Sequence, residues 1–251
     1  MLLMVSVPNL DLLEEPYSNE PELEDSLHLA QIVLLLTCLE WWWQKRQDFF
    51  VAANLSIYYQ PPELQSKKFR GPDFFVVLGT ERRPRRSWLV SRENGQYPNV
   101  IVEILSRKTA KTDQTTKRDL YQNLFQTPEY FWFNPDPKKL EFVGLRLQAG
   151  HYQDIPRTAE GWMWSEQLEL YLGIANHQLR YFTPEGVMIP NFEEESAQSG
   201  EIIKALEQRL EREQRRAEQS ESVVQQQSEE LERLRSYLRS QGIDPNQLTQ
   251  P

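Results

Sequence analysis

The stretch NVIVEILS, residues 99–106, places one acid, Glu103, inside an otherwise apolar run. Short runs rich in Val and Ile that are bounded by polar residues are typical of buried strands. A glutamate is rarely buried without a partner, because removing its charge from water is costly. We therefore expect a buried strand in which Glu103 faces a metal ion, a hydrogen-bond donor or the cation of a salt bridge.

A second acid stands where another predicted strand begins. Gly71, Pro72 and Asp73 lead directly into the apolar run FFVV at 74–77. Taken alone, an aspartate at this place is an ordinary turn residue. If the two strands are neighbours, Asp73 and Glu103 can share one Mg²⁺ through oxygen ligands and water. A structural salt bridge of Glu103 is the alternative.

The rest of the first 192 residues predicts the elements around these strands. Apolar residues recur every three or four positions from Ser26 to about Gln47, which predicts a long helix, and residues 114–125 have a helical composition. Strands are predicted at 49–59, 73–78, 100–105 and 129–133, and hairpins that complete the sheet at 140–147, 151–155, 178–182 and 187–189. The expected fold is an α+β mixed sheet flanked by helices.

Composition divides the chain into four parts. Residues 1–24 are acidic and contain three prolines, which predicts an irregular lead-in before a globular domain at 25–192. Residues 193–241 are rich in Glu, Gln, Arg and Ser and predict a long helix. Gly242 and Pro245 end it, so 242–251 are expected to form a flexible tail.

Apolar residues recur every seven positions in the predicted tail helix. They are Ile203, Leu210, Ala217, Val224, Leu231 and Leu238. The matching positions three residues later are apolar only at the two ends of the series, so the seam is polar in the middle. Residues 201–240 therefore predict a homo-oligomeric coiled coil of modest stability, with a single exposed helix or a partly disordered tail as the alternative.

Charge and cysteine content narrow the classes of function. The net charge is −9, but residues 26–192 carry 20 bases and 17 acids. Their basic cluster, Arg82, Arg83, Arg85 and Arg86, is either a phosphate-binding patch or a solvated loop. The single cysteine excludes a disulfide framework and a thiolate zinc site, and the longest apolar run, 32–39, is too short to span a membrane. We expect a soluble cytoplasmic protein.

A third group of polar residues lies on the predicted helix that follows Glu103. In DQTTKRDLY, residues 113–121, Asp113 and Lys117 are four residues apart, and so are Lys117 and Tyr121. An Asp–Lys pair at this spacing on an exposed helix face is a common stabilising contact. Only its combination with Asp73 and Glu103 points to chemistry.

That combination resembles a known family. The segments FRGPD at 69–73, VEILS at 102–106 and PEYFW at 128–132, together with Lys117 and Tyr121, resemble the Uma-type restriction endonuclease family of the PD-(D/E)XK nuclease superfamily. The resemblance covers about residues 20–190. Glu24 and His28 also resemble the acid-to-histidine spacing of that family, and the tail resembles its frequent coiled-coil ending.

The resemblance implies a restriction-endonuclease-like fold in which Asp73 and Glu103 bind Mg²⁺ or Mn²⁺ and a lysine lies near the scissile phosphate. The superfamily usually has this lysine two residues after the second acid, where this chain has Leu105. In the Uma-type pattern the lysine lies on the following helix, which corresponds to Lys117. The rivals Lys108 and Lys111 lie in the intervening loop and are less well placed.

The resemblance also implies an activity: metal-dependent endonucleolytic hydrolysis of phosphodiester bonds in DNA. The metal would polarise a phosphoryl oxygen and activate water, and Lys117 would stabilise the charge that develops on the phosphate. Glu24 either adds a catalytic carboxylate or caps the first helix, and a lone histidine such as His28 is more typical of a local hydrogen bond. The alternatives are an inactive nuclease-fold binding module assembled through 201–240 and a coiled-coil structural protein.

Overall fold

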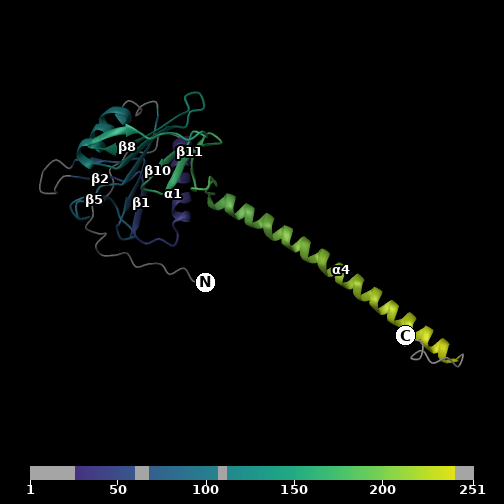
Figure 1. Ribbon diagram of the computed structural model, residues 1–251. Coiled ribbons are helices and arrows are strands. Elements are labelled where there is room, and N and C mark those ends of the chain that lie inside the picture. The colour runs from purple at the N-terminus through teal and green to yellow at the C-terminus, as the bar shows by residue number, and fades with distance from the viewer. Residues whose placement is uncertain (1–25, 60–67, 107–111, 241–251) are drawn as a thin grey trace. The chain divides into compact units, whose positions relative to one another are not determined.

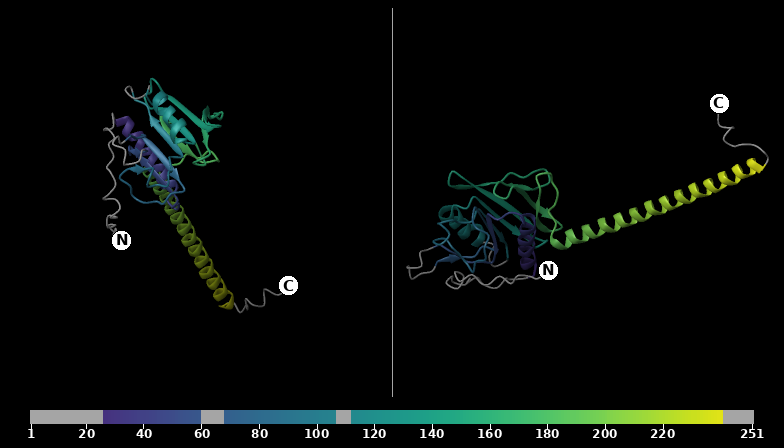
Figure 2. Two further views of the ribbon diagram at one scale, coloured as in Figure 1. Left: turned by 90° about the vertical axis from the view of Figure 1, so that its left-hand side faces the viewer. Right: turned by 90° about the horizontal axis from the view of Figure 1, so that it is seen from below.

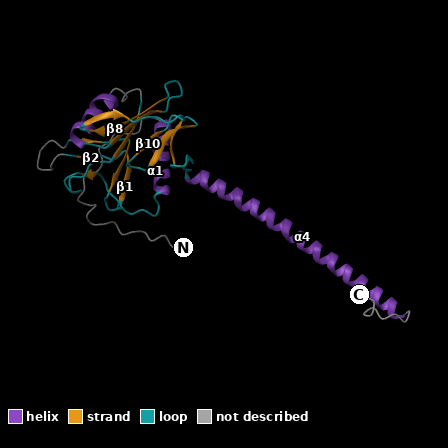
Figure 3. Cartoon of the chain, in the orientation of Figure 1, coloured by secondary structure: helices purple, strands orange, loops and turns teal. Residues whose placement is uncertain are grey.

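The computed structural model describes residues 26–59, 68–106 and 112–240. The chain divides into two units, one that ends at Phe192 and one that begins at Glu193, and each unit is described by itself. Figure 1 labels the elements, and Figure 3 distinguishes helices, strands and loops.

The first unit contains a six-stranded mixed sheet. Its strands are, in spatial order, β1 (Phe49–Ala53), β4 (Phe74–Leu78), β6 (Val100–Ile104), β7 (Glu129–Asn134), β8 (Glu141–Gln148) and β9 (His151–Asp154). Only β6 and β7 pair in parallel, and the other neighbours are antiparallel. The connection between the two parallel strands carries a helical segment, because parallel neighbours need a crossover. The mixed sheet that the sequence predicts is confirmed.

The crossover segment consists of three consecutive helical pieces. They are η2 (Asp113–Lys117), α3 (Arg118–Leu120) and η3 (Tyr121–Phe125). The two outer pieces have π-helical geometry, which is uncommon and frequently occurs at functional sites. Gln126 follows with a left-handed φ of 53° and ends the segment before β7.

The faces of the central sheet pack against different layers, because successive side chains of a strand point to opposite sides. Phe74, Val76, Val100 and Val102 belong to one apolar cluster, which includes helix α1 (Ser26–Trp42). Phe75, Val77 and Ile101 belong to a second cluster, which includes Tyr121 and Phe125 of the helical segment. The central strands are thus covered on both faces, which explains why β4 and β6 are apolar throughout apart from Glu103.

The hairpins predicted beyond Asn134 do not all complete the central sheet, so this prediction was wrong in part. β10 (Met163–Ser165), β11 (Leu170–Ala175) and β12 (Gln178–Phe182) form a separate three-stranded sheet, and 187–189 contributes only the isolated bridge from Met188 to Phe182. β9 exposes three of its four residues, as suits an edge strand. The separate sheet instead buries Leu170, Leu172 and Leu179 in the cluster that contains α1.

Helix α1 is tied to this separate sheet by a buried amide. The Gln31 side chain donates to the Leu179 carbonyl at 2.9 Å and accepts from the Leu179 N–H at 3.0 Å. It therefore pairs with β12 as a neighbouring strand would, and this satisfies polar groups that would be costly to bury alone. The helix ends at Trp42, five residues before the predicted end at Gln47.

The predicted strand 49–59 is divided into two short strands. Asn54 has a left-handed φ of 47° and separates β1 from β2 (Ile57–Tyr58), which pairs with β3 (Phe69–Arg70) and β5 (Trp88–Leu89) in a third sheet. Asparagine tolerates this conformation better than most residues. The break turns the chain away from β4.

The second unit contains all but the first residue of α4 (Phe192–Ser240), a helix of 49 residues that Figure 2 shows in two further views. Along it, leucines are more than half exposed, as at Leu206 and Leu231. The predicted C-terminal helix is thus present up to Ser240, whereas its association into a coiled coil stays a prediction, and Gln241 lies outside the described residues. Among the residues that the structure describes, no helix is both long and apolar enough to span a membrane.

Candidate active site

The register of two central strands brings Asp73 and Glu103 together. Phe74 of β4 lies opposite Val102 of β6, so the next residues outward, Asp73 and Glu103, are also cross-strand neighbours. The Asp73 N–H donates to Glu103 Oε2 at 3.3 Å, and the Ile104 N–H donates to Asp73 Oδ2 at 2.7 Å. The two acids that the sequence singles out are therefore neighbours at one end of β4, and each carboxylate accepts a hydrogen bond from a main-chain N–H on the other side of the strand pair.

Lys117 reaches Glu103 from the helical segment. Lys117 Nζ lies 2.9 Å from Glu103 Oε2, and the Tyr121 hydroxyl donates to Glu103 Oε1 at 2.8 Å. Leu105, which takes the usual lysine position of the superfamily, is buried in the second apolar cluster. Lys108 and Lys111 lie outside the described residues. The helix therefore supplies the cation that the strand lacks.

Asp113 belongs to the same cluster, although its spacing from Lys117 is equally typical of an exposed helical pair. Its side chain is fully buried and lies 2.9 Å from Lys117 Nζ. The Tyr130 hydroxyl donates to the Asp113 main-chain carbonyl at 2.9 Å and links the start of η2 to β7. The spacing of Asp113, Lys117 and Tyr121 is the only sequence signal that marks this acid, and it does not reveal its burial.

His28 contacts the site instead of making only a local bond on its own helix. Its Nε2 lies 3.1 Å from Asp73 Oδ1, and the residue is 5% exposed. α1 thus supplies a group to one oxygen of Asp73 while the Ile104 N–H holds the other. Glu24 lies outside the described residues, so its predicted role stays a prediction.

The electrostatics of the cluster are dominated by burial. Burial raises the pKa of Glu103 well above its usual range; the Lys117 ammonium opposes this shift, and Asp73 and Asp113 add to it. Burial also lowers the pKa of Lys117, but the carboxylates of Glu103, Asp113 and Asp73 outweigh it and raise that pKa overall. We take Lys117 as charged, because three carboxylates surround it. One ammonium then faces three acids, which leaves an excess of negative charge.

This donor set fits Mg²⁺ or Mn²⁺ better than a closed zinc site. Within residues 26–59, 68–106 and 112–240, no three His, Cys, Asp or Glu side chains gather as a metal-binding group. Mg²⁺ commonly uses only one or two carboxylates and completes its shell with water and substrate phosphate. Asp73 and Glu103 are two such carboxylates, and the negative excess around them favours a cation.

Comparisons with known proteins identify the family of the chain. The family model Uma2, described as "Putative restriction endonuclease", matches residues 19–180. The chain belongs to the Uma2 family. No curated protein matches it. A solved structure to which it is similar is that of a "putative nuclease belonging to DUF820" from Anabaena variabilis, with 14% sequence identity, 59% of this chain and 76% of that chain covered, and a TM-score of 0.42. The resemblance read from the sequence motifs is confirmed.

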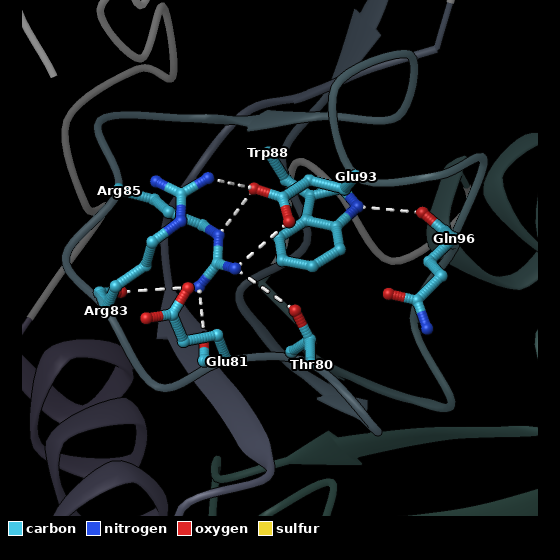
Figure 4. A network of polar contacts seen from close by, with 7 residues as sticks. All are labelled: Thr80, Glu81, Arg83, Arg85, Trp88, Glu93 and Gln96. Carbon is cyan, nitrogen blue, oxygen red and sulfur yellow. Dashed lines mark hydrogen bonds and ion pairs between the residues drawn. The ribbon is translucent and has the colours of Figure 1, made fainter. Parts of the chain in front are cut away.

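The arginine cluster of this Uma2-family chain is neither an open phosphate-binding patch nor a simple solvated loop. The Arg85 side chain is 1% exposed and donates two hydrogen bonds to the Glu93 carboxylate. Its Nε donates to Oε1 at 2.6 Å, and its Nη2 donates to Oε2 at 3.0 Å. Arg83 also binds Glu93, at 2.7 Å, and Arg82 pairs with Glu40. Figure 4 shows Arg85 at the centre of this network, next to the ring of Trp88.

A surface hollow of about 510 Å³ lies beside this network and not at the carboxylates. Its lining includes Glu40, Phe49, Arg82 and Arg83. Phe49 pairs with Leu78, at the end of β4 opposite to Asp73. We therefore place the candidate active site at the Asp73 end, where the polar chemistry is, and not at this hollow.

Proposed function

We propose that this Uma2-family chain is a Mg²⁺- or Mn²⁺-dependent endonuclease that hydrolyses phosphodiester bonds in DNA. The observation that carries the proposal is the contact between Asp73, Glu103 and Lys117, which come from three separate segments of the chain. A chance clustering of buried acids and a lysine is disfavoured, because each buried charge adds a desolvation cost. The description of the family model, "Putative restriction endonuclease", supports DNA as the substrate.

The proposed roles follow from the chemistry of each group. A Mg²⁺ ion held by Asp73 and Glu103 would polarise a phosphoryl oxygen and lower the pKa of its bound water. The Lys117 side chain is 15% exposed and Glu103 is fully buried, so Lys117 is the group of this pair that an incoming phosphate can reach. Its ammonium would stabilise the negative charge that develops on the phosphate during cleavage.

The surrounding residues hold these groups in place. Tyr121 fixes one oxygen of Glu103, and Asp113 keeps the Lys117 ammonium charged and directed into the cluster. His28 holds Asp73 from the side of α1. Preorganised groups of this kind accelerate a reaction because they need no rearrangement when charge develops.

The test is cleavage of supercoiled plasmid by the full-length chain with Mg²⁺ or Mn²⁺ and with a chelator. Asp73→Asn, Glu103→Gln and Lys117→Met are each expected to lower the cleavage rate by about 100-fold or more, the usual loss when an electrostatic catalytic group is removed. Asp119→Asn is the matched control, since Asp119 is exposed on the same helical segment and is expected to keep full activity. Cleavage that survives chelation, or equal rates for the wild type and Asp73→Asn, would contradict the proposal.

A second candidate function is a binding module that keeps the nuclease fold without catalysis. Glu103 offers no free oxygen at the surface, because it is 0% exposed and both of its oxygens already accept hydrogen bonds. A metal ion has to compete with the Lys117 ammonium for Oε2. Titration calorimetry separates the two functions: no heat of Mg²⁺ or Mn²⁺ binding, together with retained binding of a DNA duplex, supports the binding module.

We also propose that the chain forms a homo-oligomer through residues 201–240. The support is the apolar series spaced by seven residues and the exposure of its leucines on α4. Burying such a strip against another helix is the usual source of coiled-coil stability.

A further inference from the structure

The tail helix exposes apolar side chains on one strip. Leu206, Leu210, Leu231 and Leu234 are each between 53% and 61% exposed on α4. In the heptad series that starts at Ile203, Leu210 and Leu231 occupy position a, and Leu206 and Leu234 occupy position d. These are the two positions that face the partner in a coiled coil. The strip is therefore placed to pack against another helix with the same repeat.

We propose that α4 forms a parallel, in-register, two-stranded coiled coil with a second copy of this chain. The proposal rests on the self-association through 201–240 put forward above and adds the number and direction of the helices. It does not depend on nuclease activity.

The order of the core positions favours the parallel direction. In a parallel pair each core residue meets its own copy, so Leu210 meets Leu210 and the polar Gln227 meets Gln227. An antiparallel pair that matches the leucines at both ends sets position a against position d, and Leu210 then meets Gln227. Facing a polar amide with a leucine leaves the amide without a partner, which is unfavourable. The parallel arrangement keeps apolar and polar layers separate.

The polar core positions favour two helices over more. Glu213 and Gln227 both occupy position d in the middle of the series. Polar residues at such positions commonly fix the oligomer state at some cost in stability, because a larger bundle removes them further from water. Glu213 also has a partner on its own helix, Arg216 Nη1 at 3.5 Å, which reduces the repulsion between the two copies of Glu213.

The flanking charges are complementary in the parallel register. Glu230 occupies position g and Arg235 occupies position e of the following heptad, the two positions that meet between parallel helices. Both residues are exposed on α4. Arg235 Nη1 lies 3.3 Å from Glu232 on its own helix, so the guanidinium is already at this surface. Each dimer gains two such contacts by symmetry.

The direction of the helices matters for the proposed reaction. Each globular unit is joined to the N-terminal end of α4, so a parallel coil joins both globular units at the same end. In an antiparallel coil, the two N-terminal ends would be separated by about the length of the helix, roughly 74 Å at 1.5 Å per residue. A parallel dimer thus allows both nuclease sites to act on one short duplex.

The first test is the molar mass of the full-length protein by light scattering coupled to size-exclusion chromatography. We expect twice the chain mass of 29.8 kDa. A monomer, trimer or larger assembly overturns the dimer. A monomer that still cleaves plasmid would leave the proposed nuclease function intact, so the two failures are distinguishable.

The second test is disulfide formation under mild oxidation. Leu206→Cys and Leu234→Cys, each alone, are expected to give a covalent dimer, because a parallel register sets each position against itself. Gln208→Cys is the matched control: it lies at position f on the far side of the helix and is expected to give no covalent dimer. The wild type controls for Cys38, which is buried.

An antiparallel coil gives a different result in the same assay. A covalent dimer then forms only when Leu206→Cys is mixed with Leu231→Cys, and Leu206→Cys alone stays monomeric on a denaturing gel. That outcome overturns the proposed direction, and so does the absence of any disulfide in a protein that is dimeric by mass. Circular dichroism of each variant verifies that the helix is retained.

Discussion

Replacing Tyr121 by Phe tests whether Glu103 is ionised in the folded protein. The substitution removes only the hydroxyl that donates to Glu103 Oε1 at 2.8 Å, and the ring keeps its fully buried place. A hydrogen bond to a charged group contributes about 1.5–3 kcal/mol, against about 0.5–1.5 kcal/mol for a neutral one. Burial favours the neutral form of Glu103, but Lys117 Nζ lies 2.9 Å from Glu103 Oε2 and favours the ionised form. We take Glu103 as ionised because of this contact, and expect Tyr121→Phe to lower the free energy of unfolding by about 1.5–3 kcal/mol. The melting temperature of a domain of this size should then fall by about 3–12 °C.

Tyr130→Phe provides the matched comparison. Tyr130 is also fully buried, but its hydroxyl donates at 2.9 Å to a neutral acceptor, the Asp113 main-chain carbonyl. Its loss is expected to be about 0.5–1.5 kcal/mol. Urea unfolding of both variants at pH 7, followed by tryptophan fluorescence and circular dichroism, measures the two losses. Equal losses would refute the reasoning, because they would mean that Tyr121 donates to a neutral Glu103.

Three further outcomes are expected. Arg85→Ala should lower the free energy of unfolding by about 3 kcal/mol, because it leaves the nearly buried Glu93 with one cation fewer. Arg82→Ala should lower it by only about 0–1 kcal/mol, because the pair of Arg82 with Glu40 is about one-third exposed. Thermal melts of both variants measure the two losses. Gly144→Ala should cost about 1–3 kcal/mol in urea unfolding, since a Cβ there would lie 2.6 Å from the Phe131 ring. Burial raises the pKa of Glu129 above its ordinary 4.5, so the stability that this group contributes is present below pH 4.5 and is lost as pH rises through the raised pKa. Glu129→Gln should therefore gain stability relative to the wild type as the pH rises from about 4 to about 7. A constant difference in unfolding free energy over that range would contradict this prediction.

The central strands could be predicted from the sequence because their signal is local. β4, β6 and β7 are short, apolar runs bounded by turn residues, and their observed bounds lie within two residues of the predicted ones. The assignment of β10 to β12 to a sheet of their own could not be predicted, because it depends on α1. The Gln31 amide that pairs with Leu179 is 148 residues away from it, and no local pattern encodes that contact.

The site could be predicted in part, for a similar reason. Glu103 is conspicuous because its neighbours are apolar, and the family motif connects it to Asp73 and Lys117. The burial of Asp113 and the contact of His28 with Asp73 could not be predicted, because spacing alone does not distinguish an exposed helical face from a buried one. The arginine cluster was ambiguous because Glu93, the partner of Arg85 and Arg83, lies eight and ten residues further along the chain.

Lys117 lies on the helical segment, whereas Glu103 lies on β6. The site therefore forms only where these two elements meet. In a strand-borne arrangement the acid and the lysine keep their spacing as long as the strand persists. Here the spacing depends on how the helical segment packs against the sheet, through the ring contact of Tyr121 with Tyr130 of β7 at 5.2 Å. A small displacement of that segment would withdraw Lys117 from Glu103 while the sheet stayed intact. Mild heat or denaturant should therefore abolish activity before the fold is lost. A ligand that stabilises the packing of the helical segment against the sheet should protect activity more than it raises the melting temperature.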